Sequence, residues 1–163
     1  MTIRFETPRL TAAQVDAGDD AAAAALVRVL TPAVAAPLPP PLQGLGTVAD
    51  AAAWIAEAAR DGALLAVRRR VGGGIIGFVI LGFDGGTAHI GYFLGQEHWR
   101  RGLGGELVRG LVAWAERADT VTRLIGIAAQ DNAASIATMT RAGFLPDEAV
   151  ATAAGMVAFV RAT

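Results

Sequence analysis

The spacing of apolar positions in the first part of the chain predicts one strand and two helices. Residues 2–14 read as an opening strand that runs into a loop. An alanine-rich run from Asp19 to about Leu30 has helical periodicity, and its two leading aspartates suit the positive end of a helix dipole. A second helix is expected from Thr47, which can cap its first turn, to a stop at Gly62.

After Gly62 the apolar positions follow the period of strands, interrupted by turn residues and by two helical stretches. The glycines at 72–74 and the Asp84-Gly85-Gly86 triplet predict hairpin turns. The expected strands are Leu64–Val71, Ile75–Leu81, Thr87–Leu94, Arg123–Ala129 and Met156–Arg161, and the expected helices are Glu106–Ala118 and Ala133–Ala142. This order of strands and helices predicts an α/β (α+β) fold, most simply in a single domain over residues 1–163.

Composition removes several classes of protein. The formal net charge is −1, which argues against a nucleic-acid partner. There is no cysteine, and the two histidines are too isolated for a metal site, so no metal is expected. Residues 31–49 are uncharged but interrupted by prolines, which excludes a membrane helix there. The opening MTIRFETPRL lacks an apolar signal core, so a soluble cytoplasmic protein is expected.

Two glycine-rich segments raise the question of a phosphate site. Gly72, Gly74 and Gly77 match G-x-G-x-x-G, but IGFVILGF follows with a strand period, so a hairpin is favoured over a dinucleotide fingerprint. HWRRGLGGEL, residues 98–107, instead stands between a strand and an amphipathic helix. Free amide groups at a helix start, close-approaching glycines and two arginines suit a pyrophosphate. A glycine-rich helix start with solvated arginines is the alternative, and the residues alone favour neither.

The segment at 98–107 resembles the pyrophosphate loop of the GNAT superfamily, the acetyl-CoA-dependent N-acetyltransferases. The family signature is Q/R-x-x-G-x-G/A, in which Gly102 and Gly104 match and Trp99 departs from Gln or Arg. IGYFLGQEHWRRGLGGEL is similar to the RimJ/RimL-type branch, which acts on ribosomal proteins and shares the Trp. Two further blocks support the branch: TPRL near the start, with Thr7, Arg9 and Leu10, and QDNAASIATMTRAGF, with Asn132, Ser135, Arg141, Gly143 and Phe144.

The resemblance implies a GNAT fold, with a central mixed, mostly antiparallel twisted sheet flanked by helices, and acetyl-CoA as cosubstrate. It also implies an amine acceptor, either a protein N-terminus or a small molecule, no nucleic-acid or membrane partner, and a homodimer through the late strands. The proline-rich residues 32–46 are either a stiff connecting loop or one wall of the acceptor pocket. The implied cofactor-binding residues are Tyr92, Phe93, Leu94, Arg100, Arg101, Gly102, Leu103, Gly104, Gly105, Asn132 and Ser135.

Two catalytic residues follow from the same resemblance. His89 stands where many members have Glu before I-G-Y, and an imidazole can accept a proton near neutral pH, so His89 is the candidate base. Glu97 is a poorer candidate. Ser135 is the candidate proton donor to the leaving thiolate, and a backbone N–H near Phe93 or Leu94 could polarise the thioester carbonyl.

Structural alternatives stand beside these catalytic roles. His89 can be an ordinary strand residue that faces solvent or core, and Asn132 with Ser135 can simply cap a helix. A site with only a modest base suits α-amines, which are more easily deprotonated than lysines. The alternative function is an inactive GNAT-fold module that binds acyl-CoA.

Overall fold

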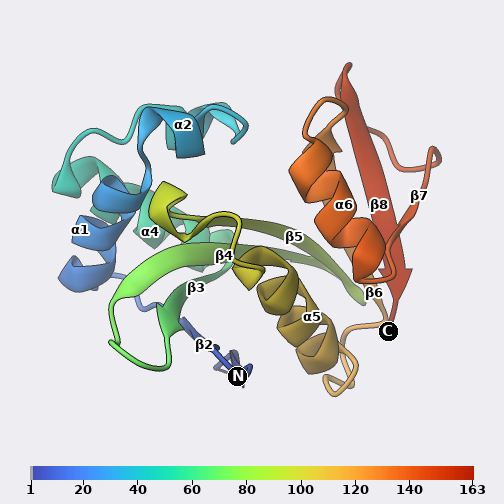
Figure 1. The fold of residues 1–163 in the computed structure, drawn as a ribbon, viewed down its shortest axis with the longest axis horizontal. Helices are drawn as coiled ribbons and strands as arrows, with labels where there is room; N and C mark the ends of the chain where they lie inside the picture. The colour runs from blue at the N-terminus through green and yellow to red at the C-terminus, as the bar shows by residue number, and fades with distance from the viewer. Residues whose placement is uncertain (1) are drawn as a thin grey trace.

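The computed structural model describes residues 2–163 as one eight-stranded sheet with helices on both faces (Figure 1). The helices are α1 (Asp20–Val29), α2 (Pro32–Ala35), α3 (Pro40–Gln43), α4 (Val48–Asp61), α5 (Leu103–Ala115) and α6 (Ala133–Arg141), with a short 3₁₀ turn η1 (Gln96–His98). The strands are β1 (Arg4–Glu6), β2 (Leu10–Gln14), β3 (Gly62–Arg69), β4 (Ile75–Asp84), β5 (Thr87–Leu94), β6 (Arg123–Ala129), β7 (Leu145–Pro146) and β8 (Met156–Ala162).

The strand order is β1-β2-β3-β4-β5-β6-β8-β7. All neighbouring pairs are antiparallel except β5 and β6, which run parallel and are connected through α5. The expected mixed, mostly antiparallel sheet is therefore confirmed. No helix of the described residues 2–163 is long and apolar enough to cross a membrane.

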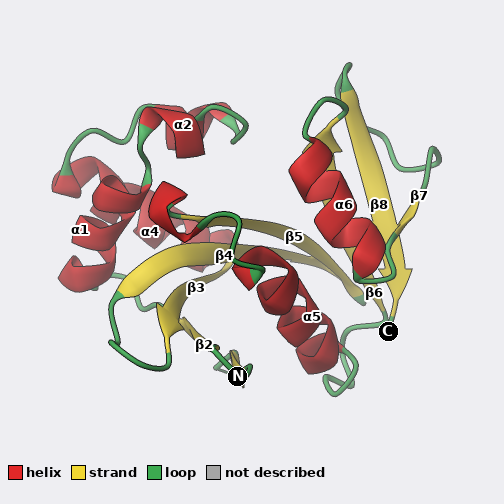
Figure 2. Cartoon of the chain, in the orientation of Figure 1, coloured by secondary structure: helices red, strands yellow, loops and turns green. Residues whose placement is uncertain are grey.

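Helices lie on both faces of the sheet (Figure 2), and each face has its own hydrophobic core. On one face α5 and α6 cover a cluster that includes Ile90 and Leu124, and on the other α1 and α4 cover Phe78 and Phe93. Strand β5 contributes to both cores, because successive side chains of a strand point to opposite faces. Ala88, Ile90, Tyr92 and Leu94 face α5 and α6, whereas Phe93 belongs to the opposite core.

The beginning of the chain differs from the expectation of a single strand. Residues 2–14 form a hairpin of β1 and β2, because the chain reverses at residues 7–10. The Thr7 amide donates to the carbonyl of Leu10 at 2.9 Å, and the Leu10 amide donates to the Thr7 hydroxyl at 3.0 Å. Pro8 in this turn is a typical turn residue, but the prediction rested on hydrophobic periodicity alone and so missed the reversal.

The proline-rich segment also differs from the expectation. Residues 32–46 contain α2 and α3, and each starts with a proline in its first helical position. Proline is tolerated there because the first amides of a helix have no intrahelical acceptor. β7 was not predicted at all, since two residues are too short for a periodic signal.

The helix after the glycine-rich segment starts earlier than predicted, at Leu103 instead of Glu106, and ends at Ala115 instead of Ala118. Gly102 is its N-cap and has φ 74°, a left-handed conformation that favours glycine. Gly104 and Gly105 therefore lie inside the first turn of α5 and not in a preceding loop. The hairpin at Gly72–Gly74 is confirmed, because β3 and β4 pair antiparallel on either side of it.

Candidate functional site

Strands β5 and β6 pair at their amino ends and separate at their carboxyl ends. Their parallel register joins Thr87 to Arg123 and ends with Ile90 opposite Gly126. Both strands continue beyond that point, β5 to Leu94 and β6 to Ala129. The sheet therefore has a wedge-shaped break in the middle, and α5 begins just beyond its open end (Figure 1).

The antiparallel register with β4 determines which backbone groups of β5 face this break. The Gly95 amide donates to the carbonyl of Ile76, directly opposite, at 2.8 Å. Hydrogen-bonded and non-hydrogen-bonded pairs alternate along an antiparallel ladder, so Phe93 bonds to β4 while Tyr92 and Leu94 do not. The amides of Tyr92 and Leu94 therefore point toward β6, where no strand pairs with them.

This register corrects one expectation about the carbonyl-polarising amide. The backbone of Phe93 is engaged with β4, and its ring lies 5.8 Å from that of Phe78 in the opposite core. Of the two amides named from the sequence, only that of Leu94 faces the break. The amide of Tyr92 joins it as a second candidate.

The segment after η1 combines a helix start with two exposed cations. Arg100 and Arg101 are exposed, and Arg100 has φ 58°, uncommon for a residue with a side chain. The first backbone bond of α5 runs from the Glu106 amide to the carbonyl of Gly102 at 3.1 Å. The amides of Leu103, Gly104 and Gly105 precede that bond and have no acceptor within the helix. The Leu103 side chain is buried, so this residue offers only its amide.

A buried carboxylate, Glu106, lies in the first turn of α5, directly after this segment. Glu106 is 8% exposed, and its Oε1 accepts from the Thr7 hydroxyl at 2.6 Å and from the Arg9 amide at 2.7 Å. Its Oε2 accepts from Nε of Arg9 at 2.6 Å. Burial alone would raise the pKa of the Glu106 carboxyl, but the bonds from Thr7 and Arg9 outweigh it and the pKa is lowered.

Arg9 connects this carboxylate to the loop itself. Its NH1 donates to the carbonyl of Arg101 at 3.0 Å, and its NH2 would lie 3.5 Å from a Cβ placed on Gly102. The sequence marked Thr7 and Arg9 only as positions of resemblance and Glu106 only as part of a segment of resemblance and the start of a predicted helix, and it gave none of them a role. The spacing between residues 9 and 106 offered no signal of their contact.

Trp99 replaces the Gln or Arg of the family signature and has a structural role here. Its indole Nε1 donates to the carbonyl of Leu94 at 2.9 Å. The bond fastens the loop to the end of β5, the strand whose amides face the break. Trp99 therefore stabilises residues 100–102 even though it departs from the family signature.

The other side of the break is lined by the start of α6. The side-chain oxygen of Asn132 accepts from the Ser135 amide at 3.2 Å, so Asn132 caps the helix, as one alternative foresaw. The Tyr92 phenol lies near the side chains of Ser135 and Thr138. Burial raises the pKa of Tyr92 more than these two polar neighbours lower it, so the phenol keeps its proton at neutral pH.

His89 lies one residue before the pairing of β5 with β6 ends, and its side chain is exposed. The alternation of β5 turns His89 to the face opposite α5 and α6, away from Ser135. Glu97 lies in η1, 3.4 Å from Nε2 of His98. The structure thus brings Tyr92 and Ser135 together on one face and puts His89 alone on the other.

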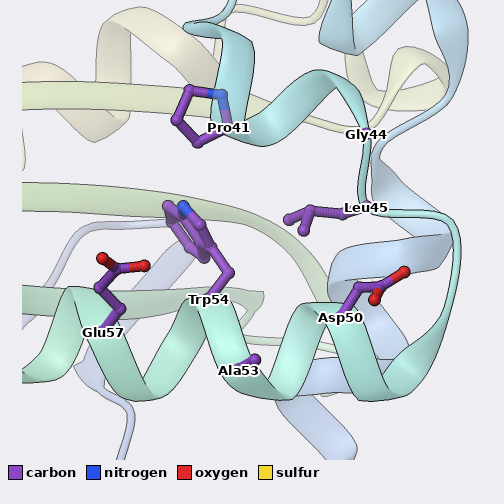
Figure 3. A pocket seen from close by; sticks show the side chains of 7 residues that line it. All are labelled: Pro41, Gly44, Leu45, Asp50, Ala53, Trp54 and Glu57. Carbon is purple, nitrogen blue, oxygen red and sulfur yellow. The ribbon is translucent and has the colours of Figure 1, made fainter.

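On the same face of the sheet as His89, the segment of α2 and α3 borders two open hollows. One, of about 430 Å³, lies between α3 and α4 and is shown in Figure 3. There the Trp54 ring stands up from α4 toward Pro41, with the carboxylate of Glu57 beside it. The remaining lining residues are Gly44, Leu45, Asp50 and Ala53. Within residues 2–163, no group of three or more histidines and carboxylates could hold a metal ion.

Comparison with known proteins identifies the family to which the chain belongs. The family model described as "Acetyltransferase (GNAT) domain" matches residues 9–145. The chain therefore belongs to the GNAT acetyltransferases and is an acetyl-CoA-dependent N-acetyltransferase. No curated protein sequence matches the chain.

Solved structures show the same fold at low identity. Ribosomal-protein-S5-alanine acetyltransferase from Vibrio fischeri has a TM-score of 0.77 at 16% identity, covering 98% of this chain and 96% of its own. RimL, a ribosomal L7/L12 α-N-protein acetyltransferase solved with coenzyme A, has 0.78 at 16%, covering 96% and 95%. Aminoglycoside acetyltransferase AAC(6')-Ib, also solved with coenzyme A, has 0.75 at 20%, covering 94% of each chain.

Proposed function

We propose that this N-acetyltransferase transfers the acetyl group of acetyl-CoA to a primary amine, either a protein N-terminal α-amine or that of a small molecule, as in the RimJ/RimL-type branch. One observation supports the position that we propose for the reaction. Strand β5 presents unpaired amides to a break in the sheet, and this break opens toward residues 100–105 at the start of α5. A long ligand with an anionic end and amide groups fits this combination.

The residues at this break in the sheet suit both the diphosphate and the pantetheine of acetyl-CoA. The amides of 103–105, with the exposed Arg100 and Arg101, would hold the diphosphate at the start of α5. The β5 groups that face the break would pair with the amides of the pantetheine. When bound there, the cosubstrate supplies an activated acetyl group as a thioester.

The chain's own groups then have three tasks. The Tyr92 or Leu94 amide polarises the thioester carbonyl, which favours attack by the amine. His89, on the open face at the narrow end of the break, takes a proton from the amine through water. Ser135, beside the protonated phenol of Tyr92, donates its hydroxyl proton to the departing sulfur as the C–N bond forms and the C–S bond breaks, and takes a proton back from water.

The acceptor approaches from the face of His89, which α2 and α3 border. An α-amine has a pKa of about 7.7–8.0 and a lysine about 10.4, so a modest base suits the α-amine. Near Trp54, the exposed Asp50 and Glu57 make no ion pair within residues 2–163. This favours an acceptor with a second positive group.

A homodimer and a cytoplasmic setting stay predictions.

The test is thiol release from acetyl-CoA across N-terminal peptides, lysine peptides, polyamines, aminoglycosides and free amino acids. We expect peptides or small molecules with a free α-amine to turn over faster than lysine side chains. His89→Ala should lower kcat most at the acidic end of pH 6 to 9, and Ser135→Ala should lower kcat at all pH values. Faster acetylation of lysine side chains would contradict the proposed acceptor, and unchanged turnover of either variant would remove that residue's role.

A second candidate is an acyl-CoA-binding module without catalysis. It is favoured by His89 in the place of the family's Glu and by the lack of a tyrosine late in the chain, since Tyr92 is the only one. Tight binding of acetyl-CoA with no thiol release in the presence of any acceptor would support it.

A further inference from the structure

The contact between the first hairpin and α5 has a direct connection to the proposed diphosphate site. Thr7 and Arg9 lie in the turn between β1 and β2, and Glu106 lies in the first turn of α5. We call these three residues the Glu106 clamp. All three of its bonds to the carboxylate are 2.7 Å or shorter, typical of charge-assisted hydrogen bonds.

The clamp reaches the loop through Arg9. One guanidinium makes the ion pair with Glu106 and also donates to the carbonyl of Arg101, between two left-handed residues, Arg100 and Gly102. A loop with two such residues needs fixed contacts to hold one conformation. Arg9 is the only described side chain that donates to a backbone group of residues 100–102.

The clamp also neutralises the negative charge of Glu106 next to the proposed diphosphate site. A carboxylate this close to the start of α5 would repel a bound diphosphate if it were free. Arg9 neutralises the charge of Glu106, and the three donors hold its oxygens on the hairpin side of the helix. The amides of 103–105 are then free to face an anion.

We propose that the Glu106 clamp is a positioning device that sets the affinity of the α5 loop for the diphosphate of coenzyme A. Its residues act through the loop and do not touch the reacting atoms. The proposal rests on the proposed placement of the cosubstrate. It adds that the β1–β2 hairpin, far from the loop in sequence, determines how strongly the diphosphate half of the cosubstrate binds.

The experiment measures two quantities. The first is the Kd of coenzyme A by calorimetry, and the second is kcat/KM for acetyl-CoA against S-acetylpantetheine, the same thioester without the diphosphate. Arg9→Lys keeps the charge, but a lysine lacks the planar fork that binds Glu106 and Arg101 together. The double variant R9Q/E106Q keeps the net charge of the pair and removes both bonds of the guanidinium, to Glu106 and to the Arg101 carbonyl. Glu116→Gln is the matched control, because Glu116 accepts from Arg161 at 2.6 Å at the other end of α5.

We expect both clamp variants to raise the Kd of coenzyme A about tenfold, the loss expected for one charge-assisted hydrogen bond, and to lower kcat/KM for acetyl-CoA through KM. S-acetylpantetheine should react within about twofold of wild type, and Glu116→Gln should bind coenzyme A normally. Equal losses with both donors would overturn the proposal, since they would indicate a general structural role. Wild-type affinity in R9Q/E106Q would also overturn it, because net charge alone would then suffice.

The two proposals fail in distinguishable ways. If wild type binds coenzyme A but transfers no acetyl group, the proposed reaction fails and the Kd values still test the clamp. Should R9Q/E106Q not fold, Arg9→Lys carries the test, with thermal unfolding as the check that it is folded. An unchanged Kd in folded Arg9→Lys would then refute the clamp.

Discussion

Glu106 has an environment that makes its charge part of the stability of the protein. The carboxylate is buried and accepts three hydrogen bonds from Thr7 and Arg9, which together lower its pKa. A group whose pKa is lower in the folded state stabilises the fold above its unfolded pKa. This contribution is lost as the pH falls through the folded pKa, below the ordinary range of a glutamate near 4.3.

We therefore predict that Glu106→Gln lowers the free energy of unfolding by about 1–3 kcal/mol at pH 7. The difference from wild type should shrink as the pH falls below the ordinary range of a glutamate near 4.3, where the carboxyl first takes up its proton in the unfolded chain. Urea unfolding at pH 7 and at pH 3.5 measures both values, with Glu116→Gln as the exposed control. A difference that stays constant between the two pH values would show that the charge of Glu106 does not matter.

Trp99 offers a second prediction at this scale. Trp99→Phe keeps an aromatic ring but loses the bond from Nε1 to the Leu94 carbonyl. Because Trp99 is 43% exposed, we expect little change in thermal stability. Coenzyme A should bind about fivefold more weakly, in line with the loss of one neutral hydrogen bond that fastens the loop. Normal affinity in calorimetry would mean that the loop does not depend on this bond.

Single residues show where sequence reasoning reaches its limit. Gly102 and Gly104 could be recognised, because a helix start that approaches an anion needs glycine and the signature places it. The clamp could not be found, since it joins residues 97 positions apart and only the fold brings them together. Phe93 was chosen by position in the strand, but the register with β4 decides which amides face the break.

At the scale of elements, α5 packs against the first hairpin through a glycine. A Cβ on Gly110 would lie 2.5 Å from Cγ2 of Thr7 and within 3.0 Å of the Phe5 ring. Gly110→Ala must therefore push the hairpin away from the helix. Overpacking of this kind costs typically about 1–3 kcal/mol.

The prediction is that Gly110→Ala lowers the unfolding free energy by that amount and also weakens binding of coenzyme A, because Thr7 moves with the hairpin. Urea unfolding and calorimetry measure the two effects. For the unfolding free energy alone, Gly105→Ala is a useful comparison, since its Cβ would meet only the end of the flexible Arg109 side chain at 3.2 Å. Equal stability of Gly110→Ala and wild type would contradict the described packing of α5 on the hairpin.

Most elements could be predicted from periodicity, and the misses have physical reasons. Thr87–Leu94 and Arg123–Ala129 were predicted with the bounds observed, because turn residues or polar segments flank each strand. The start of α5 was placed three residues late, since glycine disfavours helices and hid the first turn. Residues 32–46 were expected as a loop, although a proline can begin a helix as well as break one.

At the scale of the whole molecule, the site arises from one irregularity in the sheet. Only β5 and β6 are parallel neighbours, and their separation beyond Ile90 exposes strand amides in the interior of the protein. Periodicity predicted the strands but not how they pair, and the resemblance to GNAT acetyltransferases predicted a mixed, mostly antiparallel sheet without a strand order. The motifs could be placed in order along the chain, whereas the distances between them required the fold.

The measurement that tests this account most directly is backbone amide hydrogen exchange with and without acetyl-CoA. We predict slower exchange on binding at Tyr92, at Leu94 and across Leu103–Gly105, with no change in the hairpin at Gly72–Gly77. Protection confined to that hairpin, or absent from both β5 and the start of α5 when acetyl-CoA is bound, would contradict the assignment of the cosubstrate to this break in the sheet.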